Sequence, residues 1–163
     1  MTDRLPTAEL TFDKLRAGDR FPIGSHRMIR EEIIAFASKY DPQPFHLDDS
    51  AAAASPIFTG LSASGWHSVL VMNLMIDRFW KGTSVRGLAG GGVDELRWIE
   101  PVYPDDELAG TIEVVNVRPS ASRPERGVMT MRTTLHNQNG RPVVTMLIMG
   151  VFARDGTATP PKA

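Results

Sequence analysis

The chain has 163 residues, which fits a single domain, and it contains no cysteine, which excludes disulfides, thiolate metal sites and a cysteine nucleophile. Its 18 basic and 19 acidic residues give a formal net charge of −1, without the basic excess of a nucleic-acid-binding protein. No signal-peptide pattern opens the sequence, and the longest apolar stretch, Val69 to Trp80, is too short and too interrupted to span a bilayer. We therefore expect a cytoplasmic protein that binds neither nucleic acid nor membrane.

The first half of the chain predicts one strand followed by helices. A turn signal at Ala17–Asp19 leads into the strand. Apolar residues spaced as on one helix face run through Ile29–Tyr40, and the Asp41-Pro42 pair ends that pattern, because a residue before proline is pushed out of the α region. The following segment, Asp48–Ser55, predicts a short helix capped by Asp48 or Asp49.

The long segment Gly65–Trp80 is apolar on nearly all sides, which predicts a helix that is buried over most of its surface. We interpret Gly87–Gly92 as a glycine-rich loop. Beyond it, four β-rich runs separated by turn residues predict an antiparallel meander: Val93–Trp98, Glu107–Arg118, Gly127–Asn137 and Pro142–Ala153. The expected class is α+β, a mostly antiparallel sheet holding one buried helix, with flexible termini at residues 1–9 and 154–163.

The segment Tyr40–Asp48 carries the most chemical information. It places the carboxyl group of Asp41 and the imidazole of His46 five positions apart, between two helices. In a straight polyproline II segment these residues would lie about 15 Å apart, so they can share a water molecule only if the chain bends, for instance in a turn with Pro42 at its second position. On residue types alone, a capped helix end followed by a surface turn is the favoured interpretation of the segment.

A second candidate feature is Ser62–Trp66, which precedes the long apolar helix. The first backbone N–H groups of a helix have no partner within it, and Gly65 would let a ligand approach closely. Together these groups could donate hydrogen bonds to a developing oxyanion. An ordinary helix start capped by Ser64 explains the same residues.

Taken together, the two segments resemble the MaoC-like dehydratase family, which includes the (R)-specific enoyl-CoA hydratases. The family's hydratase motif reads roughly G-D-x-N-P-x-H-x-D after a helix that ends in F-A, and this chain has Phe36-Ala37 followed by Tyr40–Asp48. Tyr40 and Gln43 replace the usual glycine and asparagine. The matching positions are Asp41, Pro44, His46 and Asp48.

The resemblance extends along most of the chain. Ala63–Trp66 is similar to the family's A-H-G-F at the head of its central helix, and residues 91–108 are similar to its strand–turn–strand ending in P-V-x-P-G-D-x-L. The resemblance implies one domain over residues 10–153 with the hotdog fold, in which an antiparallel sheet wraps around one long helix at about Gly65–Trp80. It also implies a homodimer.

The activity implied by the resemblance is the reversible addition of water to a 2-enoyl-CoA thioester, giving the (R)-3-hydroxyacyl-CoA. Asp41 and His46 would hold and activate the water, and the Gly65 N–H would stabilise the enolate-like oxygen. The resemblance implies no metal and no cofactor, since coenzyme A enters as part of the substrate. The residues expected to contact the substrate are Gln43, Phe45, Ser64 and Trp66.

Two other functions on the same fold stay open. A thioesterase would need a carboxylate to direct water at the thioester carbon, and the candidate, Asp77, lies twelve residues beyond Gly65. A non-catalytic module for acyl-CoA or lipid binding is kept open by Tyr40 and Gln43, which depart from the motif.

Two further interpretations concern residues outside the motif. We expect His67 to pack or hydrogen-bond locally. The arginines that flank residues 119–122 suit either coenzyme A phosphates or a solvated hairpin loop: Arg118, Arg123 and Arg126.

Overall fold

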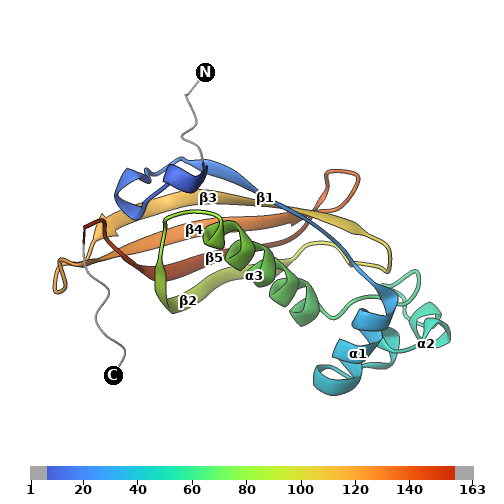
Figure 1. Cartoon of the computed structure of the whole chain (residues 1–163). Coiled ribbons are helices and arrows are strands. Elements are labelled where there is room, and N and C mark those ends of the chain that lie inside the picture. The colour runs from blue at the N-terminus through green and yellow to red at the C-terminus, as the bar shows by residue number, and fades with distance from the viewer. Residues whose placement is uncertain (1–6, 157–163) are drawn as a thin grey trace.

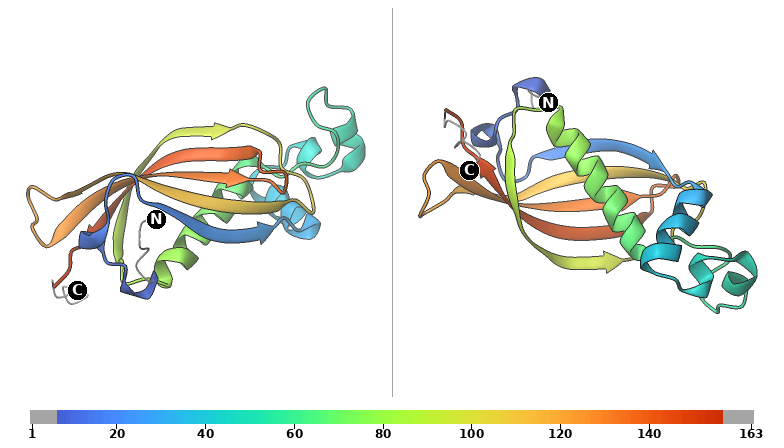
Figure 2. Two further views of the ribbon diagram at one scale, coloured as in Figure 1. Left: turned by 90° about the horizontal axis from the view of Figure 1, so that it is seen from above. Right: turned by 60° about the horizontal axis from the view of Figure 1, so that its bottom comes forward.

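Residues 7–156, the part of the chain that the computed structural model describes, contain one five-stranded antiparallel sheet with a long helix across one face (Figures 1 and 2). The sheet order is β1-β3-β4-β5-β2. The strands are β1 (Arg20–Arg27), β2 (Gly87–Trp98), β3 (Glu107–Pro119), β4 (Arg126–His136) and β5 (Pro142–Ala153). The helices are α1 (Arg30–Tyr40), α2 (Asp49–Ala53) and α3 (Gly65–Lys81), with 3₁₀ turns at Thr7–Glu9, Phe12–Lys14 and Pro44–His46.

Strand β4 shows why this sheet has one face on the core. Along it, Met129, Met131, Thr133 and Leu135 are buried, and the residues that alternate with them are partly exposed. This alternation matches the period of a strand, in which successive side chains point to opposite faces. The predicted antiparallel pairing of the last three strands is confirmed, since β4 pairs with β3 on one side and β5 on the other.

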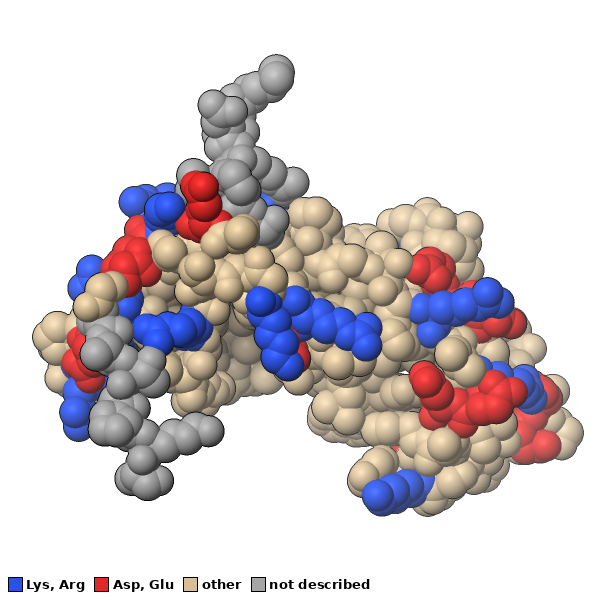
Figure 3. All heavy atoms as spheres, viewed as in Figure 1, with Lys and Arg blue, Asp and Glu red and all other residues tan. Residues whose placement is uncertain are grey.

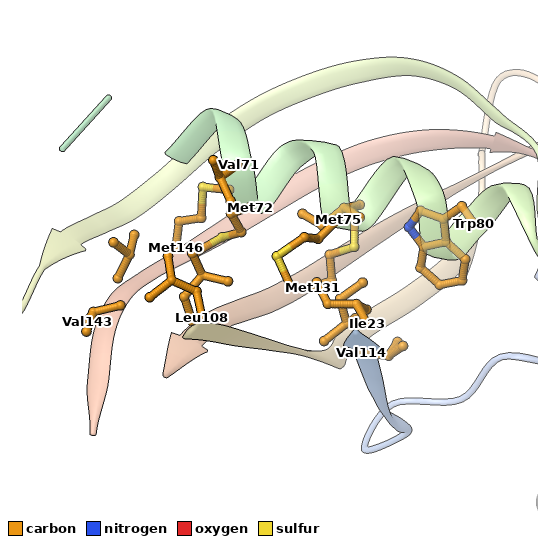
Figure 4. Packing of buried hydrophobic residues seen from close by; sticks show 14 of the residues in the cluster. Ile23, Val71, Met72, Met75, Trp80, Leu108, Val114, Met131, Val143 and Met146 are labelled. Atoms are coloured by element: carbon orange, nitrogen blue, oxygen red, sulfur yellow. The ribbon is translucent and has the colours of Figure 1, made fainter. Parts of the chain in front are cut away.

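Helix α3 packs along the buried face of the sheet. Its inward side chains, among them Met72, Met75 and Trp80, contact residues of the strands such as Leu108 and Met146 (Figure 4). The opposite side of the helix is not covered: Trp66 and Leu70 are each 55% exposed, and Leu74 follows one turn later. The prediction that the helix is buried nearly all round is therefore wrong for the single chain.

The glycine-rich segment Gly87–Gly92 is the first half of β2 rather than a loop. Glycine has little intrinsic preference for strands, so the composition favoured a loop. The segment is extended because β2 pairs with β5, from Gly87 opposite Phe152 to Trp98 opposite Val144, with three register shifts along the ladder. Strand β2 thus crosses to the far edge of the sheet and does not pair with β3, which also corrects the predicted four-strand meander.

Helices α1 and α2 lie together at the end of the sheet where α3 begins (Figures 1 and 2). The capping prediction for α2 is confirmed, because the Asp48 carboxylate accepts a hydrogen bond from the Ala51 N–H at 3.0 Å. Near the chain ends, Thr7–Glu9 form a 3₁₀ turn, and the Arg154 side chain donates to Asp13 at 2.9 Å. The rest of the predicted flexible termini, residues 1–6 and 157–163, lies outside the described residues.

Lys and Arg side chains and Asp and Glu side chains both occur on the face shown in Figure 3, and neither sign covers it. Such a mixed surface agrees with the nearly balanced charge of the sequence. Within residues 7–156, no helix is long and apolar enough to cross a bilayer.

Candidate active site

The segment that links α1 to α2 bends sharply, and the bend brings the predicted acid and imidazole together. Helix α1 ends where the Asp41 N–H donates to the Ala37 carbonyl at 2.9 Å. The Gln43 N–H then donates back to the Asp41 carbonyl, and the His46 N–H donates to the Gln43 carbonyl, which closes a 3₁₀ turn opened by Pro44. As a result, Asp41 Oδ2 lies 3.6 Å from His46 Nε2.

The orientation of the His46 ring is set by the chain on its other side. Its Nδ1 lies 2.8 Å from the Ser62 carbonyl oxygen, and the side chain is only 8% exposed. Because a carbonyl can only accept, Nδ1 carries a proton, and in the neutral ring the lone pair is then on Nε2. The imidazole is therefore held in the form that can accept a proton at the nitrogen beside Asp41.

The carboxylate of Asp41 is held by the start of α3. Ser64 Oγ donates to Asp41 Oδ2 at 2.7 Å and accepts from the Trp66 N–H at 3.2 Å, so one hydroxyl caps the helix and orients the acid. The 3.6 Å separation between Asp41 and His46 is too long for a direct hydrogen bond. It suits a water molecule that hydrogen-bonds to both groups.

Asp41 and His46 line a cavity of about 420 Å³. Its other walls come from the start of α3, from the segment that follows β2, and from the loop before α3. The lining from these elements includes Gly65, Trp66 and Ser68; Trp98, Ile99, Glu100, Pro101 and Val102; and Ile57, Phe58 and Ala63. Most of these side chains are apolar, and the polar groups are few, as in sites that bind small organic ligands.

Gly65 is the first residue of α3 and lies directly against the Trp98 side chain. The N–H of a first helical residue has no acceptor within its helix, so this donor is available to a ligand in the cavity. A Cβ on Gly65 would lie 2.3 Å from Trp98 Nε1, which is closer than atoms can approach. The indole of Trp98 also meets the ring of Trp66 edge to face, at a centroid distance of 5.3 Å. Glycine is therefore required while Trp98 stays in this position.

Of the residues predicted from the sequence, Asp41, His46, Gly65 and Trp66 share this cavity, and Gln43, Phe45 and Ser64 do not line it. Ser64 is fully buried behind Asp41. Phe45 packs against the rings of His46 and Phe58, at 4.5 and 4.9 Å between centroids. Direct contact of these three residues with a substrate stays a prediction. In the structure, each of them contacts Asp41 or His46 and helps to hold that residue in position.

The wall formed by Trp98–Val102 and Val144 was not assigned a role from the sequence. The first of these segments lies inside the family-like stretch 91–108, which was the available signal. Val144 carried no such signal, because its place in the wall depends on the pairing of β5 with β2.

Three other candidates lie away from the cavity lining. Asp77 is half-exposed and forms an ion pair with Lys81 at 2.7 Å. It is not among the residues that line the cavity. His67 is buried and stacks on Phe36 at a centroid distance of 4.8 Å, which confirms local packing. The arginines of the β3–β4 hairpin also do not line the cavity. Among residues 7–156, there is no group of three or more side chains suited to hold a metal ion.

Comparison with known proteins agrees with this architecture. The family described as MaoC like domain matches residues 9–137, and the chain belongs to that family. The fold is the hotdog fold. The chain is similar to the MaoC-like dehydratase from Rhodospirillum rubrum, with 36% identity, a TM-score of 0.79, and coverage of 91% of this chain and 99% of the other.

Two curated proteins are also similar. The uncharacterized protein YdeM of Bacillus subtilis is 32% identical over 79% of this chain and 89% of its own length. The mesaconyl-CoA hydratase of Cereibacter sphaeroides is 28% identical over 64% of this chain, but the match spans only 30% of that longer protein.

The environment of His67 leads to a prediction about stability and pH. Burial lowers the pKa of His67, the nearby His26 lowers it further, and Glu32 opposes the change. The folded protein thus binds fewer protons at this site than the unfolded chain. The contribution of His67 to the free energy of unfolding is therefore fully present above the unfolded pKa of about 6.5, and it is lost as the pH falls below that value. We expect the melting temperature to decrease between about pH 6.5 and pH 5.

Replacement of His67 by phenylalanine keeps a ring on Phe36 but removes the titrating group, so the His67→Phe variant should show a shallower decrease. The matched control is His136→Gln, which removes a partly exposed histidine at the end of β4. Equal slopes in the wild type and the His67→Phe variant would assign the acid sensitivity to other groups.

Proposed function

We propose that the protein catalyses the reversible hydration of a 2-enoyl-CoA thioester to an (R)-3-hydroxyacyl-CoA, without a metal or cofactor. The main support for this proposal is the Asp41–His46 pair, whose Oδ2 and Nε2 atoms lie 3.6 Å apart. Each side chain is held in place by a hydrogen bond to another residue, His46 to the Ser62 carbonyl and Asp41 to the Ser64 hydroxyl. Membership of the MaoC-like family and similarity to a hydratase support the same class of reaction.

The pair suits the acid–base chemistry that hydration needs. Water held between the two groups loses a proton to His46 Nε2 while its oxygen forms a bond to C3 of the enoyl group. The electrons of the double bond shift toward the thioester carbonyl, and C2 then takes a proton from the protonated member of the pair. The net change is addition of one water molecule, and no other reactant is needed.

The start of α3 suits the charge that develops on the thioester oxygen. The Gly65 N–H is the first donor of a 17-residue helix, and the helix dipole adds positive potential there. A fixed donor of this kind stabilises the oxyanion more than the ground-state carbonyl, so it accelerates the chemical step. Trp66 and Trp98 would flank the thioester on either side of this donor.

The dyad gives the first kinetic prediction. Replacement of either Asp41 or His46 by alanine should lower kcat about 10²–10⁴-fold, because each change removes a positioned acid–base group. The two losses should not add in the double variant, since both groups serve one water molecule. The assay follows loss of the enoyl absorbance of crotonyl-CoA, with the configuration of the product determined afterwards.

The control for this assay is Asp77→Asn, which alters a carboxylate outside the cavity lining and should leave hydration unchanged. Release of free thiol from crotonyl-CoA would indicate a thioesterase instead. Tight binding without turnover would support a non-catalytic acyl-CoA-binding protein. Near-normal hydration by the His46→Ala variant would contradict the assignment.

The contact between Gly65 and Trp98 generates a double-variant prediction. Gly65→Ala should lower kcat on the order of 10²–10³-fold, because its Cβ displaces Trp98 and occupies space that the thioester oxygen needs. The loss should persist when Trp98→Ala is the parent, since removal of the indole does not remove the Cβ. If the variant with both Gly65→Ala and Trp98→Ala is as active as Trp98→Ala alone, the loss in Gly65→Ala comes only from the clash with the indole. The melting temperatures of all variants serve as the control for folding.

We also propose that the protein is a homodimer. Strand β2 is an unpaired sheet edge and is exposed along nearly its whole length. Large apolar side chains are exposed on α3 and on β2. On α3 they are Trp66, Leu70 and Leu74, and on β2 they are Leu88, Val93 and Trp98. Exposed apolar side chains of this size next to an open edge are typical of a subunit interface, and a two-fold axis lets both copies bury them.

Light scattering at micromolar concentration should therefore give twice the chain mass of 17.9 kDa. Leu70→Glu should shift the protein toward the monomer, because it buries a charge in the apolar interface. The matched control is Val115→Glu on β3, which changes another exposed apolar side chain without touching α3 or β2. A wild-type protein that scatters as a single chain would contradict the dimer.

A further inference from the structure

Glu100 is the feature of the cavity that the proposed reaction does not use. It follows the end of β2 and lines the same cavity as Asp41 and His46, and its side chain is only 25% exposed. The lining therefore holds two carboxyl groups, Asp41 and Glu100, beside the imidazole of His46. Within the described part of the chain, no lysine or arginine is among the residues that line this cavity.

The partner of Glu100 is Arg141, on the turn between β4 and β5. Arg141 is two-thirds exposed and does not line the cavity, so water screens its charge more than that of Glu100. Arg141 could bind a carboxylate in the cavity only by leaving Glu100. That exchange would leave a largely buried carboxylate without its partner, which is unfavourable.

A substrate that carries a second carboxylate on its acyl group would therefore meet two carboxylates in this cavity and no lysine or arginine side chain among the described lining residues. A neutral acyl group would meet mainly apolar walls, such as those of Ile57, Phe58 and Val144. We propose that Glu100 is a specificity-determining residue that rejects dicarboxylate monothioesters and so restricts the enzyme to neutral 2-enoyl thioesters. This inference rests on the proposed hydratase function, and it assigns to Glu100 a repulsive role in substrate choice.

The test compares two thioesters of similar shape that differ in charge: the mono-CoA thioester of fumarate and 4-methylpent-2-enoyl-CoA. They present a carboxylate and an isopropyl group, respectively, at the same position. The wild-type protein should hydrate the neutral compound with a kcat/KM at least about 100-fold higher, because a like charge is placed beside Glu100. Equal values, or a preference for the fumarate thioester, would overturn the proposal.

The Glu100→Gln variant removes the repelling charge and should reduce this preference about 10-fold. The matched control is Glu113→Gln, which gives the same change in net charge at another carboxylate paired with an arginine, Arg20, outside this cavity. The control should keep the wild-type preference. An unchanged preference in Glu100→Gln, with a melting temperature equal to that of the wild type, would exclude Glu100 as its source.

A binding measurement separates this inference from the proposed function. Calorimetry with the saturated compounds succinyl-CoA and 4-methylpentanoyl-CoA needs no turnover, and the neutral compound should bind at least about 10-fold more tightly. If neither enoyl thioester is hydrated but this difference in Kd is present and becomes smaller in the Glu100→Gln variant, the hydratase proposal fails and the role of Glu100 in selecting the ligand stands. Equal Kd values, or no binding of either compound, would overturn the role of Glu100.

Discussion

The Ser64 hydroxyl connects the longest helix of the protein to its candidate acid. It accepts from the Trp66 N–H and donates to Asp41, so the start of α3 and the orientation of the carboxylate depend on one group. The backbone two residues earlier orients the other member of the pair, because the Ser62 carbonyl accepts a hydrogen bond from the His46 ring. The short stretch from Ser62 to Gly65 therefore orients both members of the pair and also supplies the free N–H.

This arrangement needs a helix whose position does not vary. Helix α3 is held by large buried side chains such as Met72, Met75 and Trp80, which pack on the strands. Because protein interiors are closely packed, a shift of the helix along the sheet would open voids or cause clashes. The geometry of the site is thus maintained by apolar contacts that extend along the helix, away from the reacting atoms.

Much of this structure could be predicted from the sequence, for reasons that are local. The pattern over Ile29–Tyr40, the proline after Asp41 and the alternation in β4 each follow from the geometry of one element. The bend in the Tyr40–Asp48 segment could be stated only as a condition, because its closure depends on backbone hydrogen bonds that residue types do not specify.

The remaining features depend on contacts between distant segments. Gly87–Gly92 is a strand only because β5 offers it an edge, and Trp98 reaches Gly65 only because β2 ends beside the start of α3. The pair formed by Glu100 and Arg141 likewise joins two connecting segments with no relation in sequence. Such contacts leave no periodic pattern in a single sequence.

The two edges of the sheet differ in a way that bears on how the protein behaves at high concentration. Strand β1, the edge opposite β2, contains Pro22, which has no N–H to donate, and its register shifts between Pro22 and Ser25. Another strand added along β1 would therefore lack one backbone donor at Pro22, which hinders the extension of sheets edge to edge into fibrils. In the proposed homodimer a like-to-like contact through β2 would also close on itself after two copies and leave no β2 edge to extend a fibril.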